Sequence, residues 1–180
     1  MKKSLNLPNS LALLRIALAP LMLFFLVERD LIIFENWHPT WLDYFAGLVF
    51  VIASVTDFFD GYIARSWNQM TKLGAILDPL ADKMLMLSGF LGLMIVNRAS
   101  AWAVFLILSR EFFITGLRVV AVAEGKSVAS TMAGKIKTVV QMIAIGFLIM
   151  NWPYATILLW IAVLLTIYSG YEYTRDYFKI

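Results

Sequence analysis

Four aspartates have the residue type and the spacing expected of a site that binds a cation. Asp57 and Asp60 are three residues apart, and Asp78 and Asp82 are four residues apart. Side chains at these spacings lie on one face of a helix, so each pair would present both carboxylates on the same side. The segment between the pairs is short, so the two helices should be antiparallel neighbours. We therefore predict that the four carboxylates converge.

Carboxylates inside membrane-spanning segments cost about 2.5–3.5 kcal/mol each on insertion scales, and four neighbouring anions also repel one another. A bound divalent cation, or a pair of cations, offsets both costs. The chain has no cysteine and a single histidine, His38, so the ligands would be oxygen atoms, which suit Mg²⁺, Mn²⁺ or Ca²⁺ rather than Zn²⁺. Mg²⁺ often combines carboxylates with substrate phosphates. The acidic residues therefore predict a phosphate-bearing substrate.

The residues between the two acidic pairs fit a ligand that approaches the backbone closely. Gly61 leaves space beside Asp60, and Ala64 keeps the same helix face narrow. Arg65 carries a planar guanidinium suited to phosphate or carboxylate. Gly74 is expected in the connecting loop, where the backbone can lie close to a base or a ribose. These residues predict a binding site that extends beyond the cation.

A second group of charged residues lies in the C-terminal half. Arg110 is about 13 residues from the end of its predicted helix, hence roughly 20 Å deep at 1.5 Å per residue, and a charge at that depth indicates a functional site. Arg118 follows eight residues later, and Lys135 and Lys137 begin the next apolar segment. Together they predict a basic cavity beside the acidic site, suited to an anionic acceptor. The alternative for Arg110 is a structural ion pair with Glu111.

The composition and the long apolar stretches predict a chain embedded in lipid. Of the 180 residues, 61% are hydrophobic and 15% are charged, whereas soluble domains are about 45–50% apolar and about 25% charged. A membrane-spanning helix needs about 20 mostly apolar residues. Six segments qualify: 7–27, 41–64, 78–96, 99–123, 134–150 and 154–173. The predicted fold class is all-α, a polytopic membrane protein with six transmembrane helices in a single domain, residues 1–180.

Local signals mark several ends of these segments. Asp78 before Pro79 indicates an N-cap followed by a proline at the first helical position. Gly125 suits the C-terminal end of a helix, and Ser130 or Thr131 suits the start of the next one.

The distribution of basic residues predicts that both termini are cytoplasmic. Lysine and arginine favour the cytoplasmic side of a membrane, and with six crossings only Arg29 and Arg98 of the 15 fall on the other side. Arg15 interrupts the first apolar run and no clean cleavage pattern follows, so we expect this run to be a retained helix. We expect a multi-pass protein of the cytoplasmic (inner) membrane, with its active site facing the cytoplasm and no nucleic-acid partner.

The acidic stretch, DFFDGYIARSWNQMTKLGAILDPLAD, resembles the signature of the CDP-alcohol phosphotransferase family, D-x2-D-G-x2-A-R-x8-G-x3-D-x3-D. All eight fixed positions match: Asp57, Asp60, Gly61, Ala64, Arg65, Gly74, Asp78 and Asp82. The resemblance implies six transmembrane helices, a homodimer, and two divalent ions (Mg²⁺ or Mn²⁺) held by the four aspartates, where they bind the diphosphate of CDP-diacylglycerol. It also implies that Asp82 is the base that deprotonates the acceptor hydroxyl.

The resemblance assigns roles to further residues. The implied CDP-diacylglycerol-binding residues are Asp60, Gly61, Ala64, Arg65, Gly74 and Asn9. The opening NLPNSLALLR and the later REFFITGLRVVAVAEGKSVASTMAGKIKTVVQM are similar to the bacterial phosphatidylglycerophosphate synthases of this family, although Ala12 stands where that group often has threonine. The implied acceptor is sn-glycerol 3-phosphate, with its phosphate bound by Arg110, Arg118, Lys135 and Lys137.

Other functions fit part of the pattern. A small transporter that uses buried carboxylates as relays explains the intramembrane charge, but it gives no reason for Ala64, Arg65 and the two glycines at their spacings. A membrane prenyltransferase also binds diphosphate through aspartate and metal, but its motifs resemble this pattern less well. A sibling enzyme would use inositol phosphate, serine or phosphatidylglycerol as acceptor. For the first acidic pair, the alternative to metal binding is a structural ion pair with Arg65 or Lys83.

Overall fold

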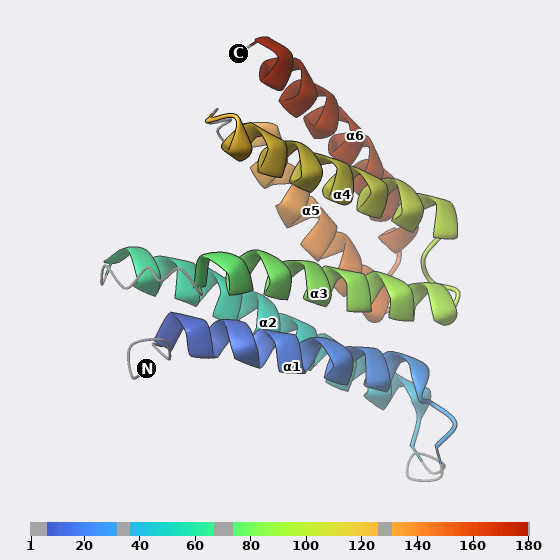
Figure 1. Ribbon diagram of the computed structural model, residues 1–180. Helices are drawn as coiled ribbons and strands as arrows, with labels where there is room; N and C mark the ends of the chain where they lie inside the picture. The colour runs from blue at the N-terminus through green and yellow to red at the C-terminus, as the bar shows by residue number, and fades with distance from the viewer. Residues whose placement is uncertain (1–6, 32–36, 67–73, 126–130, 180) are drawn as a thin grey trace. The chain divides into compact units, whose positions relative to one another are not determined.

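The computed structural model describes residues 7–31, 37–66, 74–125 and 131–179, and within these ranges every regular element is a helix. The elements, shown in Figure 1, are α1 (Leu7–Val27), α2 (Pro39–Ser66), α3 (Gly74–Ile95), α4 (Ala101–Ala123), α5 (Met132–Ile149) and α6 (Ala155–Lys179). The predicted all-α class is confirmed, and each of the six predicted segments corresponds to one helix.

Four of the helices are long and apolar enough to cross a membrane, over the stretches Asn9–Val27, Pro39–Asp57, Met132–Ile149 and Ala155–Phe178. The other two are also long, since α3 has 22 residues and α4 has 23, or about 33–35 Å at 1.5 Å per residue. They differ in where their charges lie, because every 18-residue stretch of either helix contains three ionisable residues: Asp78, Asp82 and Lys83 on α3, and Arg110, Glu111 and Arg118 on α4. Length therefore does not separate α3 and α4 from the other helices.

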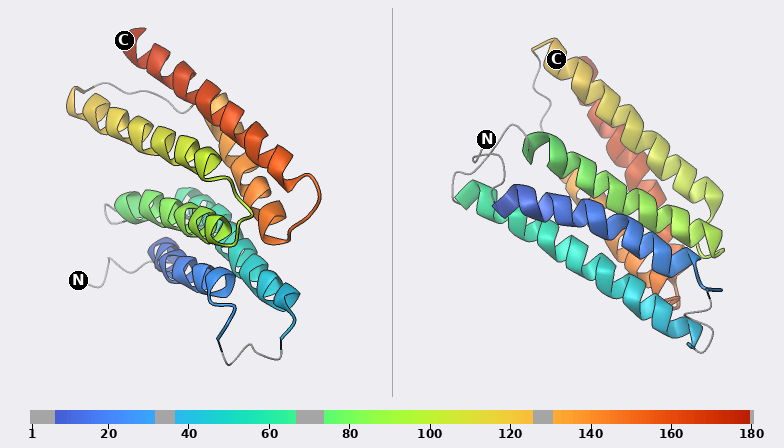
Figure 2. Two further views of the ribbon diagram at one scale, coloured as in Figure 1. Left: turned by 90° about the vertical axis from the view of Figure 1, so that its right-hand side faces the viewer. Right: turned by 60° about the horizontal axis from the view of Figure 1, so that its bottom comes forward.

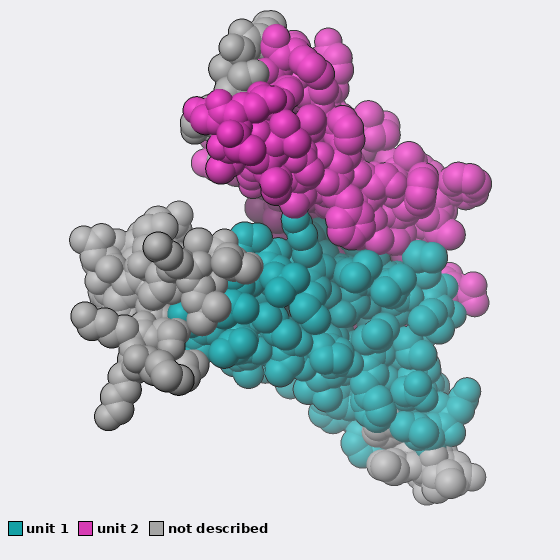
Figure 3. Space-filling view, viewed as in Figure 1, with its two compact units in different colours: residues 1–96 teal, residues 97–180 magenta. Residues whose placement is uncertain are grey.

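The chain forms two compact units, residues 1–96 and residues 97–180, which Figure 3 colours separately. The first unit contains α1, α2 and α3. In this unit α1 packs along both α2 and α3, which make few contacts with each other, and the right-hand view of Figure 2 shows α1 between them. The described parts of α2 and α3, which we expected to be antiparallel neighbours, therefore meet chiefly through α1. In the second unit, α6 packs on both α4 and α5.

Small residues explain how α1 can serve as the central helix of the first unit. Ala12 and Ala19 are fully buried on α1. On α3, a Cβ added to Gly92 would lie 2.8 Å from Cδ1 of Leu26 on α1. Small side chains let helix backbones approach closely, which is how helices pack in lipid. The spacing of the helices in this unit thus depends on these three positions.

The predicted helix boundaries around residue 130 are confirmed. Thr131 is the N-cap of α5, and its hydroxyl accepts a hydrogen bond from the backbone N–H of Gly134 at 3.1 Å. Gly125 follows α4 with a φ of +71°, the left-handed conformation that glycine adopts without strain. Ser130, the other candidate cap, lies outside the described residues.

The predicted start of α3 is wrong, because the helix begins at Gly74 and Asp78 and Pro79 both lie inside it. The first four N–H groups of a helix have no intrahelical partner, so a proline just after them removes only one hydrogen bond near the helix end. The helix tolerates this loss and extends one turn further. Gly74, expected in the loop, is therefore the first residue of α3, where it is buried.

Candidate active site

Arg15 joins the two acidic helices. It forms ion pairs with Asp57 of α2 and Asp82 of α3, donating from Nη1 to Oδ1 of both carboxylates. The Arg15 side chain is 0% exposed, whereas those of Asp57 and Asp82 are 38% and 48% exposed. The guanidinium therefore lies on the buried side of both carboxylates. One acid from each predicted pair is brought to the same cation, supplied by the helix that packs between them.

Asp78 lies one helical turn before Asp82 on α3. Its Oδ1 is buried and accepts no hydrogen bond from the described residues. Its carboxylate interacts electrostatically with Arg15 and with Asp57. A buried polar atom without a partner costs about 1–3 kcal/mol. A bound cation would satisfy this oxygen.

The donor set fits a divalent cation, although only part of it is described. Oxygen atoms of carboxylates are the ligands that Mg²⁺ and Mn²⁺ prefer. Within the described residues, no three acidic or histidine side chains are close enough together to hold an ion by themselves. Asp60 follows Asp57 by three residues on α2, but its side chain lies outside the described part. The unsatisfied oxygen of Asp78 is the observation that favours a metal here.

The predicted nucleotide-binding residues fall at the ends of α1, α2 and α3. Four of them lie in the last turns of α2, with side chains outside the described part of the structure: Asp60, Gly61, Ala64 and Arg65. Gly74 starts α3. Asn9 is in the first turn of α1 and is 1% exposed. Ala12, where threonine was expected, is fully buried, so the smaller residue packs against neighbouring side chains.

In the second unit, Glu111 of α4 is the acceptor for two cations. Lys137 of α5 donates from Nζ to Oε1 of Glu111, and Nη1 of Arg110 lies 3.3 Å from the same oxygen. Nη2 of Arg110 donates to the hydroxyl of Ser169 on α6 at 3.0 Å. Lys137 is only 4% exposed. The pair of Arg110 with Glu111, which the sequence left as an alternative, is thus present, and it is part of a network that links three helices.

The other two predicted basic residues differ in their surroundings. The Arg118 guanidinium lies 5.7 Å from the centre of the Tyr173 ring, and it interacts electrostatically with Arg110 and Lys137. Lys135 is exposed near the start of α5. Three of the four predicted residues therefore share one electrostatic environment. Three cations and one carboxylate, Glu111, leave an excess of two positive charges, which an anion would neutralise.

Two polar atoms near these cations have no hydrogen-bond partner among the described residues. They are Nε of Arg110 and the hydroxyl of Tyr173, and both are buried. Nearby, Gln141 of α5 donates a hydrogen bond to the Thr166 hydroxyl of α6 at 2.7 Å, which links these two helices. The unit therefore combines satisfied interhelical hydrogen bonds with two donors that a ligand would satisfy.

Sequence reasoning did not assign Arg15 to the acidic site, nor Glu111, Ser169 or Tyr173 to the basic one. Arg15 had a usable signal, since it is the one charged residue within the 21 residues of α1 and intramembrane charges mark functional sites. Ser169 and Tyr173 had no such signal, because their role depends on which face of α6 meets α4. That face becomes known only when the helices are packed.

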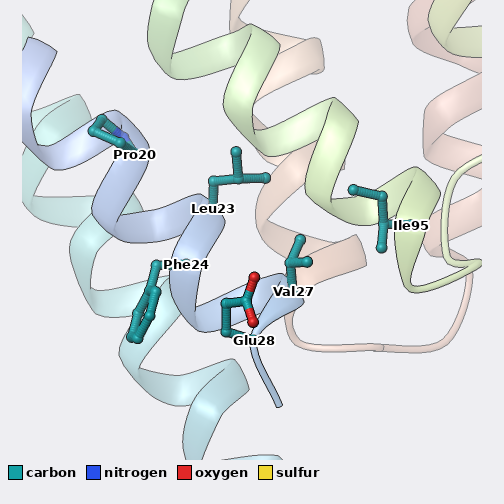
Figure 4. A pocket seen from close by; sticks show the side chains of 6 residues that line it. All are labelled: Pro20, Leu23, Phe24, Val27, Glu28 and Ile95. Carbon is teal, nitrogen blue, oxygen red and sulfur yellow. The ribbon is translucent and has the colours of Figure 1, made fainter. Parts of the chain in front are cut away.

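A shallow groove beside the C-terminal part of α1 is separate from these groups. It has a volume of about 270 Å³ and is lined by Pro20, Leu23, Phe24, Val27, Glu28 and Ile95 (Figure 4). Its lining is apolar except for Glu28, and none of the predicted site residues contributes to it. The groove is therefore not part of the candidate active site.

Comparison with known proteins shows to which family this chain belongs. A family model described as CDP-alcohol phosphatidyltransferase matches residues 5–168, across both units. A relative from Bacillus subtilis (strain 168), named CDP-diacylglycerol–glycerol-3-phosphate 3-phosphatidyltransferase, is 43% identical over 93% of each chain. Relatives with the same name are 39% identical over 97% of each chain in Rickettsia bellii (strain RML369-C) and 38% identical over 93% of this chain and 92% of theirs in Escherichia coli (strain K12). The chain therefore belongs to the CDP-alcohol phosphatidyltransferase family.

Proposed function

We propose that this protein transfers the phosphatidyl group of CDP-diacylglycerol to sn-glycerol 3-phosphate, which yields phosphatidylglycerophosphate and CMP. The relatives named for this reaction support the choice of substrates. The structural observation that carries the proposal is the joining of Asp57 and Asp82 through buried Arg15, with an unsatisfied oxygen of Asp78 nearby. This is a set of acidic groups suited to a metal–diphosphate complex.

The acidic residues would hold the diphosphate end of CDP-diacylglycerol. Asp57, Asp60, Asp78 and Asp82 are the proposed ligands of two divalent ions, Mg²⁺ or Mn²⁺. When bound, these ions would neutralise the diphosphate and stabilise the charge that develops on the leaving phosphate. The cytidine end would be bound by Gly61, Ala64, Arg65, Gly74 and Asn9, and the acyl chains would remain in the bilayer.

Asp82 is the proposed general base. Its Oδ1 accepts a hydrogen bond from Arg15, and its side chain is 48% exposed, which makes this carboxylate accessible to a substrate hydroxyl. Asp82 takes the proton of the primary hydroxyl of glycerol 3-phosphate as that oxygen attacks the β-phosphorus. The bond from that phosphorus to the CMP oxygen breaks, and CMP leaves with the electron pair. Positioning and electrostatic stabilisation supply most of the rate.

The basic residues of the second unit are the proposed site for the acceptor's phosphate. Arg110, Arg118 and Lys137 carry more positive charge than Glu111 neutralises, and the Nε of Arg110 has no described acceptor. Arginine binds phosphate through a planar set of donors, and lysine binds it as a point charge. Lys135, exposed at the start of α5, would contact the phosphate from the surface.

We also propose that α3 and α4 cross the membrane together with the four more apolar helices. Both termini and the acidic residues would then face the cytoplasm, at the inner membrane of a bacterial cell. The support for this orientation is the bias of lysine and arginine toward one side. The protein would act as a homodimer, as the family resemblance implies.

One experiment tests the choice of acceptor. Purified protein in detergent would receive labelled CDP-diacylglycerol, Mg²⁺ or Mn²⁺, and one alcohol at a time: glycerol 3-phosphate, inositol phosphate, serine or phosphatidylglycerol. We expect phosphatidylglycerophosphate and CMP with glycerol 3-phosphate alone. A lipid product with another alcohol would assign a sibling reaction. Failure to consume CDP-diacylglycerol with any acceptor would contradict the proposed transfer.

A further inference from the structure

We infer that Arg15 is a positioning residue of the proposed metal site, which fixes the orientation of the Asp57 and Asp82 carboxylates from the buried side. This inference rests on the proposed function, because it assigns a role within the same site. It adds a third helix, α1, to a site that the sequence motif places on α2 and α3 alone. The motif begins at Asp57, 42 residues after Arg15.

The geometry places Arg15 on one side of the two carboxylates. Nη1 of Arg15 contacts Oδ1 of Asp57 and Oδ1 of Asp82. Its side chain is 0% exposed, whereas both aspartate side chains remain more than a third exposed. The guanidinium therefore contacts both carboxylates from their buried side. Groups that hold metal ligands from behind in this way fix the ligand orientation.

The charges make the arrangement mutually dependent. Two carboxylates from separate helices repel each other, and a buried arginine without an anion is strongly destabilising. Arginine suits this place because its guanidinium is always charged and presents rigid, planar donors. Lysine would keep the charge but not the fixed geometry. Replacement by lysine therefore separates the orienting role of Arg15 from its role as a neutralising charge.

A competing interpretation is that Arg15 merely occupies the place of a metal ion. The two interpretations predict opposite results. If Arg15 competes with the ion, its removal should strengthen metal binding, since a neighbouring positive charge is lost. If Arg15 orients the ligands, its removal should weaken metal binding by about 10–100-fold, as is typical when the residue behind a metal ligand is lost.

The chain offers a matched control in the same unit. Arg29, just after α1, forms an ion pair with Asp43 of α2, and the two side chains are 19% and 9% exposed. Arg29 also donates from Nε to the carbonyl of Leu26 at 2.8 Å. This is again an arginine near α1 paired with an aspartate of α2, but neither residue belongs to the acidic site. Its loss should affect folding without affecting metal binding.

The test measures Mn²⁺ binding by electron paramagnetic resonance, with the full-length protein in nanodiscs and without substrate. We expect wild type to bind Mn²⁺, Arg15→Gln to bind it about 10–100-fold more weakly, and Arg15→Lys to lie between them. Arg29→Gln should lower the thermal midpoint but keep the wild-type dissociation constant. The thermal midpoint of every variant would be measured in parallel.

Each outcome bears on a different claim. Unchanged or tighter Mn²⁺ binding in the Arg15 variants, with normal binding in wild type, would overturn the inference and leave the proposed reaction intact. A wild-type protein that binds no Mn²⁺ would contradict the metal site and the inference together. If Arg15→Gln does not fold, Arg15→Lys decides the question, because it retains the buried positive charge.

Discussion

Gly170 of α6 lies against the side chain of Arg110 of α4. A Cβ added to Gly170 would lie 3.0 Å from Cγ of Arg110 and 3.4 Å from its Nε. The preceding residue, Ser169, accepts a hydrogen bond from Nη2 of the same arginine at 3.0 Å. One turn of α6 thus leaves room for the aliphatic part of the Arg110 side chain and also binds its guanidinium group. The position of this arginine depends on the absence of a single methyl group.

Gly170→Ala should displace Arg110 and weaken acceptor binding. The added methyl group is closer to Cγ than ordinary contact allows, so the arginine must shift by a few tenths of an ångström, and we expect this shift to weaken its hydrogen bond to Ser169. Loss of one hydrogen bond to a charged group is worth about 1.5–3 kcal/mol, and 1.4 kcal/mol is tenfold in affinity. We expect the KM for glycerol 3-phosphate to rise about tenfold or more, with little change in the KM for CDP-diacylglycerol.

The control for this variant is Gly116→Ala on α4, where the added methyl group would have no atom within 4 Å. Alanine is about 0.5–1 kcal/mol better than glycine inside a helix, so this variant should be at least as stable as wild type and keep its KM. An unchanged KM in Gly170→Ala would show that Arg110 can move without loss of acceptor binding.

Tyr173→Phe should weaken acceptor binding without loss of stability. The Tyr173 hydroxyl is buried and has no hydrogen-bond partner in the described residues, and Arg118 lies over the same ring. If this hydroxyl donates a hydrogen bond to the acceptor's phosphate, removal of the hydroxyl costs about 0.5–1.5 kcal/mol of binding free energy. That corresponds to roughly a 2–10-fold rise in the KM for glycerol 3-phosphate. The thermal midpoint should not fall, because no bond within the protein is lost.

Tyr177→Phe is the matched control, since its hydroxyl lies 3.2 Å from Oε2 of Glu124. This variant should lose stability and keep its KM, the reverse of Tyr173→Phe. Equal KM values for wild type and Tyr173→Phe would remove the Tyr173 hydroxyl from the acceptor site.

Glu111 and Lys137 should show strong thermodynamic coupling. Glu111→Gln leaves Lys137, which is 4% exposed, without its charged partner. Removal of one member of a buried ion pair costs about 3–5 kcal/mol, and we expect the low end of this range because the Glu111 side chain is 19% exposed. Lys137→Met with Glu111→Gln should be more stable than Glu111→Gln alone, as measured by thermal unfolding in detergent. Additive effects would mean that the pair contributes no coupling energy.

Asp82→Asn should abolish turnover and leave some CDP-diacylglycerol binding. Asparagine keeps the shape of the side chain but cannot act as a base, and general base catalysis contributes about 10²–10⁴-fold. Turnover and binding would be measured separately with labelled CDP-diacylglycerol. Asp43→Asn is the control, since Asp43 is also paired with an arginine but lies outside the site. Full activity in Asp82→Asn would remove Asp82 from the role of base.

Removal of divalent metal should also stop the reaction. Treatment of wild type with a chelator should abolish turnover, because the diphosphate and the acidic residues would then repel each other. Addition of excess Mg²⁺ or Mn²⁺ should restore it. Turnover that persists after exhaustive chelation would contradict a metal-dependent mechanism.

Gly92→Ala should destabilise the first unit. The added methyl group would lie 2.8 Å from Cδ1 of Leu26, 3.1 Å from its Cβ and 3.2 Å from Cδ1 of Leu23, so the two leucines would have to change conformation and α1 and α3 would pack less closely. Overpacking of this kind costs about 1–3 kcal/mol. Leu26→Ala combined with Gly92→Ala should destabilise the protein less than the sum of the two single changes. The smaller side chain at position 26 makes room for the added methyl group, which fills part of the space that leucine leaves. Thermal unfolding of the four proteins would show whether the effects are additive.

Much of this architecture could be predicted because it depends on local sequence. Long apolar stretches predicted six helices, since a helix satisfies its own backbone hydrogen bonds. Thr131 and Gly125 marked helix ends because capping depends on a few neighbouring residues. The start of α3 was misjudged, since a helix tolerates a proline near its beginning. The acidic motif indicated the family because its spacing lies within one short segment.

The sequence by itself therefore determined the helices, the family and the residues capable of binding phosphate and metal. The tertiary structure alone decided which of these residues meet. Arg15 reaches Asp57 and Asp82 because α1 packs against both acidic helices, and Arg110 is held by Ser169 and Gly170 because α6 packs on α4. These contacts join residues 42 to 67 positions apart. The periodicity of one helix reports which residues share a face, but only the packing of several helices determines what that face contacts.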